Sequence, residues 1–476
     1  MSISAVLAFW PLISGFLPNA QAASISTAGE SAGPDGGAAT PGVAGVVFNP
    51  ALLAVTPGFQ AMLDAQASAI RLEVTADRNG GIDPNTGAPY KPSTAKVVVP
   101  NAILGASWQV VPDRLGFGLA VYDPFVGGGD YTSTESGDTP PYTGAQRYHI
   151  INTKIITLAV EPAVGVTVVD GLHVGAGVAY VKDILQVLQA SDPLGTEGIL
   201  SEQLGMEVPD DPYALDTYLS GSTSGSHVAW NAGVFFNRWE KLQVGLSYAG
   251  PSTFHAEGEG EVDVPQDLST EEGGVVVPAN LAIEFKLPSV LRFNVVSALD
   301  DRWTVGAGVE LQQWYSCCNS QDGDISIQVT NQDGNAIGPD DGVTIEIDKQ
   351  QYNPRRLWDA GDFIAHVGWQ TNDKLWLGLR SGYNAHAVPD YAVSPSNLDF
   401  DNVFGMVGAR YRAGEHVVLG LAYTKYFLMT RTIKDSAWDL RDGNERFSPE
   451  LPYKAGTNGT YSGQVDGLGL RLGVEI

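Results

Sequence analysis

The feature that most constrains this chain is a repeated alternation in which every second residue is apolar. The segment 115–122 reads LGFGLAVY, the segment 172–179 reads LHVGAGVA, and the segment 375–379 reads LWLGL. The residues between the apolar ones are glycine, small or polar. An apolar period of two is typical of a strand that presents only one face to an apolar environment. The alternation therefore predicts an all-β protein.

The connections between these segments are short and long in turn. Six short polar turns each precede a strand, and one further strand at either end, near 62–74 and 465–476, brings the expected number to 14. The short turns are 112–114, 170–171, 237–241, 300–302, 371–374 and 413–415. The long connections are 76–95, 124–146, 183–226, 250–278, 318–356, 384–401 and 427–460. Short turns on one side and long loops on the other are typical of an outer-membrane barrel, whose closure satisfies every strand edge in lipid. We expect a transmembrane antiparallel β-barrel of about 14 strands over 59–476, with long extracellular loops.

Composition and charge exclude several other classes. The chain has 27 basic and 54 acidic residues, and its net charge of −27 argues against a nucleic-acid partner. Two cysteines exclude a disulfide scaffold and a multi-cysteine metal site. A secreted β-sandwich also alternates, but it would not gather its long loops on one side. We expect no cofactor and no metal.

The first residues have the character of an export leader. Residues 1–22 carry no charged side chain, and Ala20-Gln21-Ala22 is a small-x-small cleavage site. The alternative is a buried N-terminal helix. We expect cleavage near Ala22 and delivery to the bacterial outer membrane. The partners would then be the barrel-assembly machinery, outer-membrane lipid and lipopolysaccharide.

Glycines recur on the face of the strands that does not meet lipid. Glycine in a strand marks a bend or the close approach of another backbone, so a barrel lined with glycine has room for a segment threaded through it. The stretch 23–58 is rich in Gly, Ala and Pro and has neither strand nor helix periodicity. We expect it to form an N-terminal plug (hatch) inside the lumen. A flexible periplasmic tail is the alternative.

A family resemblance supports the same arrangement. The motif Phe48-Asn49-Pro50-Ala51 resembles the Asn-Pro-Ala signature of the FadL/TodX family, which comprises outer-membrane transporters of long-chain fatty acids and other hydrophobic compounds. The motif follows a leader and a Gly/Ala-rich stretch and precedes the first strand. Weaker similarity to family strands occurs at 230–234 (WNAGV), 285–288 (FKLP) and 303–314. The resemblance implies a barrel of fourteen strands and assigns the motif to the plug.

The resemblance also implies a function. Members take up hydrophobic compounds passively: the ligand is captured among the outer loops, the plug shifts, and the ligand leaves sideways through the wall. We therefore expect a porin-like channel for hydrophobic small molecules, above all long-chain fatty acids. Uptake of aromatic hydrocarbons and a structural or adhesive barrel remain alternatives.

One segment is suited to lateral release. Asp123, Pro124, Phe125 and Gly127 end the third expected strand, and a proline followed by glycines favours a kink or bulge. We interpret these four residues as a candidate lateral gate. The alternative is an ordinary strand end that enters an outer loop.

Another segment is suited to capture of the ligand. Leu185, Leu188, Ile199 and Leu200 fall within the long connection expected at 183–226, and exposed apolar side chains there would form a capture surface. The alternative is a small apolar cluster that holds the loop together.

The remaining chemical signals are weak. Cys317 and Cys318 are adjacent, and both a disulfide and two free thiols are open. The acidic loop stretches lack the twelve-residue calcium pattern. An outer-membrane lipase is the enzyme alternative, for which His149 and Ser133 are the available pair, but Ser133 lies in a polar loop without fixed geometry. We expect no enzymatic activity.

Overall fold

The structure of the chain is a computed structural model. It describes residues 6–7, 33–76, 93–131, 149–191, 215–239, 241–318, 325–344, 346–347, 350–353, 356–395, 397–436 and 457–476. Among these ranges, no helix is long and apolar enough to cross a membrane.

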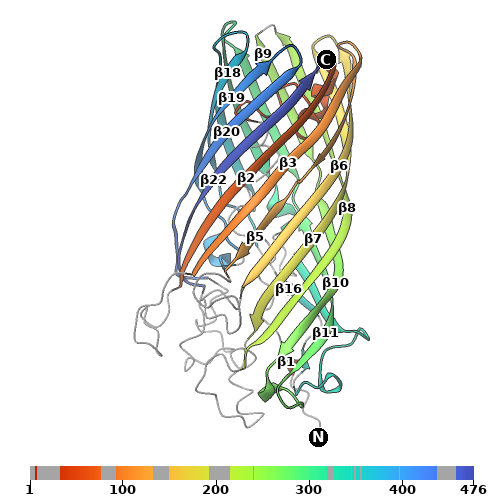
Figure 1. Ribbon diagram of the computed structural model, residues 1–476, viewed down its shortest axis with the longest axis vertical. Helices are drawn as coiled ribbons and strands as arrows, with labels where there is room; N and C mark the ends of the chain where they lie inside the picture. The colour runs from red at the N-terminus through yellow and green to blue at the C-terminus, as the bar shows by residue number, and fades with distance from the viewer. Residues whose placement is uncertain are drawn as a thin grey trace.

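The main sheet closes on itself. Strand β2 (Phe59–Ala76) pairs antiparallel with β3 (Ser93–Val111) on one side and with β22 (Gly459–Glu475) on the other, with Gln60 opposite Glu475. Figure 1 shows β22, β2 and β3 side by side as long tilted strands. Because the first strand is hydrogen-bonded to the last, the ladder has no free edge over this stretch, as a wall in lipid requires.

The barrel has fourteen strands, and six of them are interrupted. The sheet contains 20 strand elements, and counting each of the six interrupted pairs once leaves 20 − 6 = 14. This confirms the expected fold class. The other uninterrupted strands are β6 (Asn152–Val169), β7 (Leu172–Ser191), β8 (Thr217–Trp239), β18 (Leu375–Asn384) and β19 (Asn402–Ala413). The interrupted ones are β4/β5 (Leu115–Tyr122, Val126–Asp130), β9/β10 (Leu242–Ala249, Ser252–Val264), β11/β12 (Val275–Leu287, Val290–Ala298), β13/β14 (Trp303–Gln312, Ile325–Asn331), β16/β17 (Gln350–Asn353, Ala360–Gln370) and β20/β21 (Val417–Leu428, Arg431–Ile433).

Apolar side chains face outward, as lipid requires. Along β22, Leu468, Leu470 and Leu472 are 53%, 59% and 48% exposed, and they alternate with Gly469 and Arg471 on the lumen side. The period-two pattern of the sequence therefore separates a lipid face from a lumen face.

Several strands extend further than the sequence indicated. β7 continues to Ser191 and β8 begins at Thr217, while β10 and β11 occupy most of the expected connection 250–278. The alternation persists in these extensions, but its polarity inverts: on β10 the outward Glu257 is exposed and the inward Phe254 is buried. Assigning these segments to loops was wrong because that assignment required apolar outward residues.

The remaining elements are short. β1 (Val6–Leu7) pairs in parallel with β15 (Glu346–Ile347), apart from the main sheet. The helical turns are α2 (Gly45–Phe48), η1 (Pro50–Ala54), η3 (Gln266–Leu268), α4 (Trp314–Cys318), η4 (Pro339–Asp341) and η5 (Asp390–Ala392).

Candidate functional site

The N-terminal segment 33–57 lies inside the barrel. Its helical turns α2 and η1 are buried, and η1 contacts β3, β4, β6, β7 and β8. Of the motif residues, Phe48 is 4% exposed and Asn49 and Ala51 are fully buried. The structure thus brings Phe48, Asn49, Pro50 and Ala51 together against one side of the lumen.

Lumen-facing glycines make this approach sterically possible. A Cβ at Gly116 would overlap the carbonyl oxygen of Leu53, and one at Gly175 would overlap the backbone of Pro50. Because the obstructing atoms belong to the backbone, a side-chain rotation would not relieve either clash. The glycines of β4 and β7 therefore form a cradle for η1.

Asn49 fixes the segment by hydrogen bonds. Its side-chain oxygen accepts from the backbone N–H of Ala51, which caps η1, and its amide nitrogen donates to the carbonyls of Ala38 (2.8 Å) and Val234 (3.0 Å). From the wall, the Asn231 amide donates to the carbonyls of Val46 and Val47 at 3.0 and 3.2 Å. Two buried amides therefore tie the segment to β8.

Charged and polar groups hold the beginning of the segment. Asp35 accepts a hydrogen bond from Arg410 at 2.6 Å, and Arg380 donates to the Gly36 carbonyl at 3.0 Å. Beside this stretch lies a polar cavity of about 110 Å³ that Arg410 and Arg471 help to line.

The wall is interrupted between β4 and β5. Residues 123–125 form no ladder. After them, β5 pairs with β6. Residues Ile103 to Val111 of β3 pair with β4. Within the described ranges, β5 has no ladder with β3. The Asp123 carboxylate accepts from the Ala102 backbone N–H at 2.6 Å, and Pro124 has no N–H to donate. Three of the four candidate gate residues thus form the break, and Gly127 begins the next ladder opposite Ile155.

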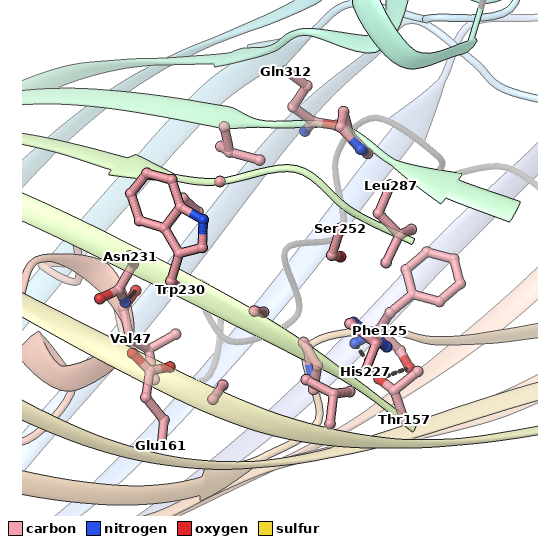
Figure 2. A pocket seen from close by; sticks show the side chains of 18 of the residues that line it. Val47, Phe125, Thr157, Glu161, His227, Trp230, Asn231, Ser252, Leu287 and Gln312 are labelled. Carbon is pink, nitrogen blue, oxygen red and sulfur yellow. Dashed lines mark hydrogen bonds between the residues drawn. The ribbon is translucent and has the colours of Figure 1, made fainter. Parts of the chain in front are cut away.

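A cavity of about 200 Å³ borders this break (Figure 2). Figure 2 shows Phe125, Leu287 and His227 at one end and Val47, Glu161 and Asn231 at the other. The lining also includes Gly250, Ser252 and Pro288, which lie at the interruptions of β9/β10 and β11/β12. The cavity is therefore bordered by Val47 of the N-terminal segment and by interruptions in three strands of the wall.

A second break is covered by an aromatic ring. Residues 226–230 of β8 lie between its ladder with β9 and its ladder with β10, and a Cβ at Gly250 would overlap the Trp230 indole. The indole also packs on Tyr248, with ring centroids 5.6 Å apart.

The polar residues of the cavity are mostly paired with one another. Tyr122 donates to Glu161 at 2.6 Å, and Arg292 donates to Glu310 at 2.7 Å while its guanidinium lies 5.9 Å from the centre of the Phe48 ring. The sequence does not predict these pairs. A charged residue at a lumen-facing position of a strand is the only sequence signal for such a pair. Its partner lies on another strand, and the register between the strands decides which residue that is.

The candidate capture surface is not formed as expected. Leu185 is fully buried on the lumen side of β7 and Leu188 is partly buried beside Ile151, because both belong to the strand and not to a loop. Ile199 and Leu200 lie outside the described residues, as does Ser133.

The two cysteines are bonded to each other in the structure, in the turn α4 between β13 and β14. In the part of the chain that is described, no three His, Cys, Asp or Glu side chains gather into a group that could hold a metal ion.

Comparisons with known proteins agree with this architecture. A family model described as "Outer membrane protein transport protein (OMPP1/FadL/TodX)" matches residues 4–471. The chain belongs to the FadL/TodX family. This family transports hydrophobic compounds across the bacterial outer membrane, and its members are channels.

Solved structures of the FadL/TodX family share the fold. A Pseudomonas aeruginosa FadL homologue superposes with a TM-score of 0.68 at 15% identity, covering 97% of this chain and 99% of that one. The Pseudomonas putida toluene transporter TodX gives 0.64 at 15% identity, covering 97% and 99%. The monoaromatic hydrocarbon channel CymD gives 0.63 at 16% identity, covering 94% and 97%. No curated protein matches the sequence.

Proposed function

We propose that the chain takes up neutral hydrophobic compounds passively and releases them sideways through the β4/β5 break. The observation that carries this proposal is the cavity that reaches from the N-terminal segment to Pro124 and Phe125 at that break. Each methylene group left in water costs about 0.8 kcal/mol. A route from an apolar cavity into lipid therefore avoids the watery lumen.

The segment 33–57 acts in this proposal as the plug. It packs in the lumen against β3, β4, β6, β7 and β8, and Val47 of the segment lines the cavity, so in this proposal a ligand in the cavity is blocked by the segment and leaves through the wall break. We further infer that the leader 1–22 is removed on export and that the barrel-assembly machinery inserts the chain. N-terminal sequencing of the protein from outer membranes tests the cleavage.

The charges of the cavity favour neutral ligands over carboxylates. Its lining contains Glu161 and Glu310 but a single guanidinium, Arg292, which already pairs with Glu310. A fatty-acid carboxylate would be buried there without a free cationic partner, and burying an unpaired charge is costly. We therefore propose neutral hydrocarbons, including monoaromatics, as ligands ahead of the long-chain fatty acids that the sequence resemblance suggested.

Uptake by cells tests the substrate class. Bacteria that lack their own channels of this family would be given labelled toluene or labelled oleate, with and without this chain. We expect the chain to accelerate toluene uptake several-fold more than oleate uptake. The opposite ranking would favour a fatty-acid channel. No acceleration of either compound would favour a structural or adhesive barrel.

A proline exchange tests lateral release. Pro124→Val supplies the missing N–H and a β-branched side chain, and it should extend the ladder and slow toluene uptake several-fold. Pro278→Val is the matched control, since Pro278 is exposed within the regular strand β11 far from the cavity lining. Equal rates in both variants would contradict release at the β4/β5 break.

A further inference from the structure

A buried acid–imidazole pair lines one end of the cavity. Asp183 projects into the lumen from β7 and His227 from the neighbouring β8, and His227 Nδ1 lies 2.8 Å from Asp183 Oδ2. The Asp183 side chain is 0% exposed and the His227 side chain is 7% exposed. Figure 2 places His227 beside Phe125 and Leu287, away from Glu161 and Asn231. The hydroxyl groups of Thr157 and Ser252 also line this end of the cavity, and Thr157 Oγ1 is already bonded to the Phe125 backbone.

The pair leaves one ring nitrogen open. A carboxylate oxygen only accepts, so the short contact requires the proton on Nδ1. Among the described residues, Nε2 of His227 has no hydrogen-bond partner, although the ring borders the cavity. Nε2 accepts a hydrogen bond when the ring is neutral and donates one when the ring is charged.

Another lumenal histidine, His173, differs from His227 in the hydrogen bonding of its ring nitrogens. His173 is also buried on β7, but its Nδ1 contacts Thr167 Oγ1 at 2.8 Å and its Nε2 contacts Asn237 Oδ1 at 3.0 Å. Both ring nitrogens of His173 are thus used by the protein, as is usual for a buried polar side chain. The free nitrogen of His227 faces a space that a ligand can enter.

We propose that His227, oriented by Asp183, is a hydrogen-bonding anchor for the hydroxyl group of a neutral hydrophobic ligand such as a phenol. This inference rests on the proposed uptake of neutral compounds and narrows the ligand class. A hydroxyl group both donates and accepts, so it satisfies Nε2 in either protonation state. A hydrocarbon can form no hydrogen bond with Nε2 in either protonation state. The carboxylate of a ligand would be repelled by the nearby carboxylate of Asp183.

Competition binding tests the anchor directly. Phenol and toluene are similar in size and differ in one polar group, and their relative affinity for the purified protein in lipid nanodiscs is measured by saturation-transfer NMR. Replacing both partners, in Asp183→Leu/His227→Leu, avoids leaving a buried unpaired charge. We expect the preference for phenol over toluene to fall by about three- to tenfold, the value of one hydrogen bond, with toluene affinity retained.

Two further variants separate anchoring from folding. His173→Leu removes a lumenal histidine outside the cavity and should leave the ratio unchanged. His227→Gln retains a hydrogen-bonding group and should retain part of the preference for phenol. An unchanged ratio in the double variant, or an equal loss in His173→Leu, would overturn the anchor while leaving the proposed function intact. Failure of cells to take up toluene through the wild-type chain would overturn the proposed function itself.

Discussion

Two parts of the N-terminal segment are held in the lumen by different forces. Residues 38–56 are held by shape and buried hydrogen bonds: the Ala38 carbonyl fits against Gly245, the Leu53 carbonyl fits against Gly116, and Asn49 bonds on both sides. Residues 33–37 are held by the contact of Asp35 with Arg410 and of Gly36 with Arg380, and only the ring of Pro34 approaches wall glycines, at Gly378 and Gly408. The polar cavity of about 110 Å³ lies beside the charged part.

The difference indicates where movement of the segment begins. A close-packed backbone has no small displacement available, because each shift drives a carbonyl into the wall. An ion pair next to a polar cavity can separate and be solvated at low cost. Residues 33–37, the charged part, should therefore detach from the wall first. Residues 38–56, the part packed on glycines, should move only as a unit.

The largest effect is expected at the cradle. Gly116→Ala places a Cβ where the Leu53 carbonyl lies, so η1 should be displaced and the single-channel conductance in planar bilayers should rise at least tenfold. We expect a loss of about 1–3 kcal/mol in unfolding free energy, typical of overpacking. Gly473→Ala is the control, because its Cβ would come no closer than 3.5 Å to another residue. Similar conductance in both variants would refute the role of the cradle.

A smaller effect is expected from the buried amide that joins the segment to β8. Asn49→Asp keeps the oxygen that caps η1 but removes the donors to Ala38 and Val234, and it should cost about 1–3 kcal/mol of unfolding free energy. Asn49→Ser also keeps a capping oxygen and introduces no charge, so it should cost less. Urea titration of the folded band on unheated gels ranks the two variants. A lower unfolding free energy for Asn49→Ser than for Asn49→Asp would contradict this account.

How far the sequence predicts these features depends on how local their causes are. The fourteen strands follow from period-two alternation, and the interruption at Asp123–Phe125 coincides with Pro124 and the glycines that follow it, so both have a signal within a few residues. The pairs Tyr122–Glu161 and Asp183–His227 join residues 39 and 44 positions apart, and only the register between strands brings them together. The burial of Leu185 was likewise hidden, because the polarity of the outer strand ends inverts.

The charged part should respond modestly to mutation. Asp35→Asn removes the ion pair with Arg410, in which the two side chains are 15% and 30% exposed, and should cost about 1 kcal/mol or less. Brief conductance fluctuations should become a few times more frequent, and high salt should have a similar effect on the wild type. The control is Asp466→Asn, which breaks the pair with Lys425 on the wall strands β20 and β22, where neither residue lines the polar cavity. Equally frequent fluctuations in the control variant would contradict the proposal that the contact of Asp35 with Arg410 holds the beginning of the segment.

The smallest effect is expected from mild acid. Burial alone would raise the pKa of Asp35, but Arg410, Arg471, His366 and a backbone hydrogen bond together outweigh it and hold the pKa below its ordinary value. A carboxyl group with a lowered pKa stays charged until the pH falls below about 4, so the contact with Arg410 contributes throughout the range from pH 7 to 5 and is lost only below that.

The conductance of the wild type should therefore be unchanged between pH 7 and 5 and should begin to fluctuate below about pH 4. The comparison group is Asp399, in the connection between β18 and β19, where burial raises the pKa to about 6. Fluctuations that appear near pH 6 and disappear in Asp399→Asn would assign the weak point to that connection. The charged start of the segment would then no longer be the part that releases first.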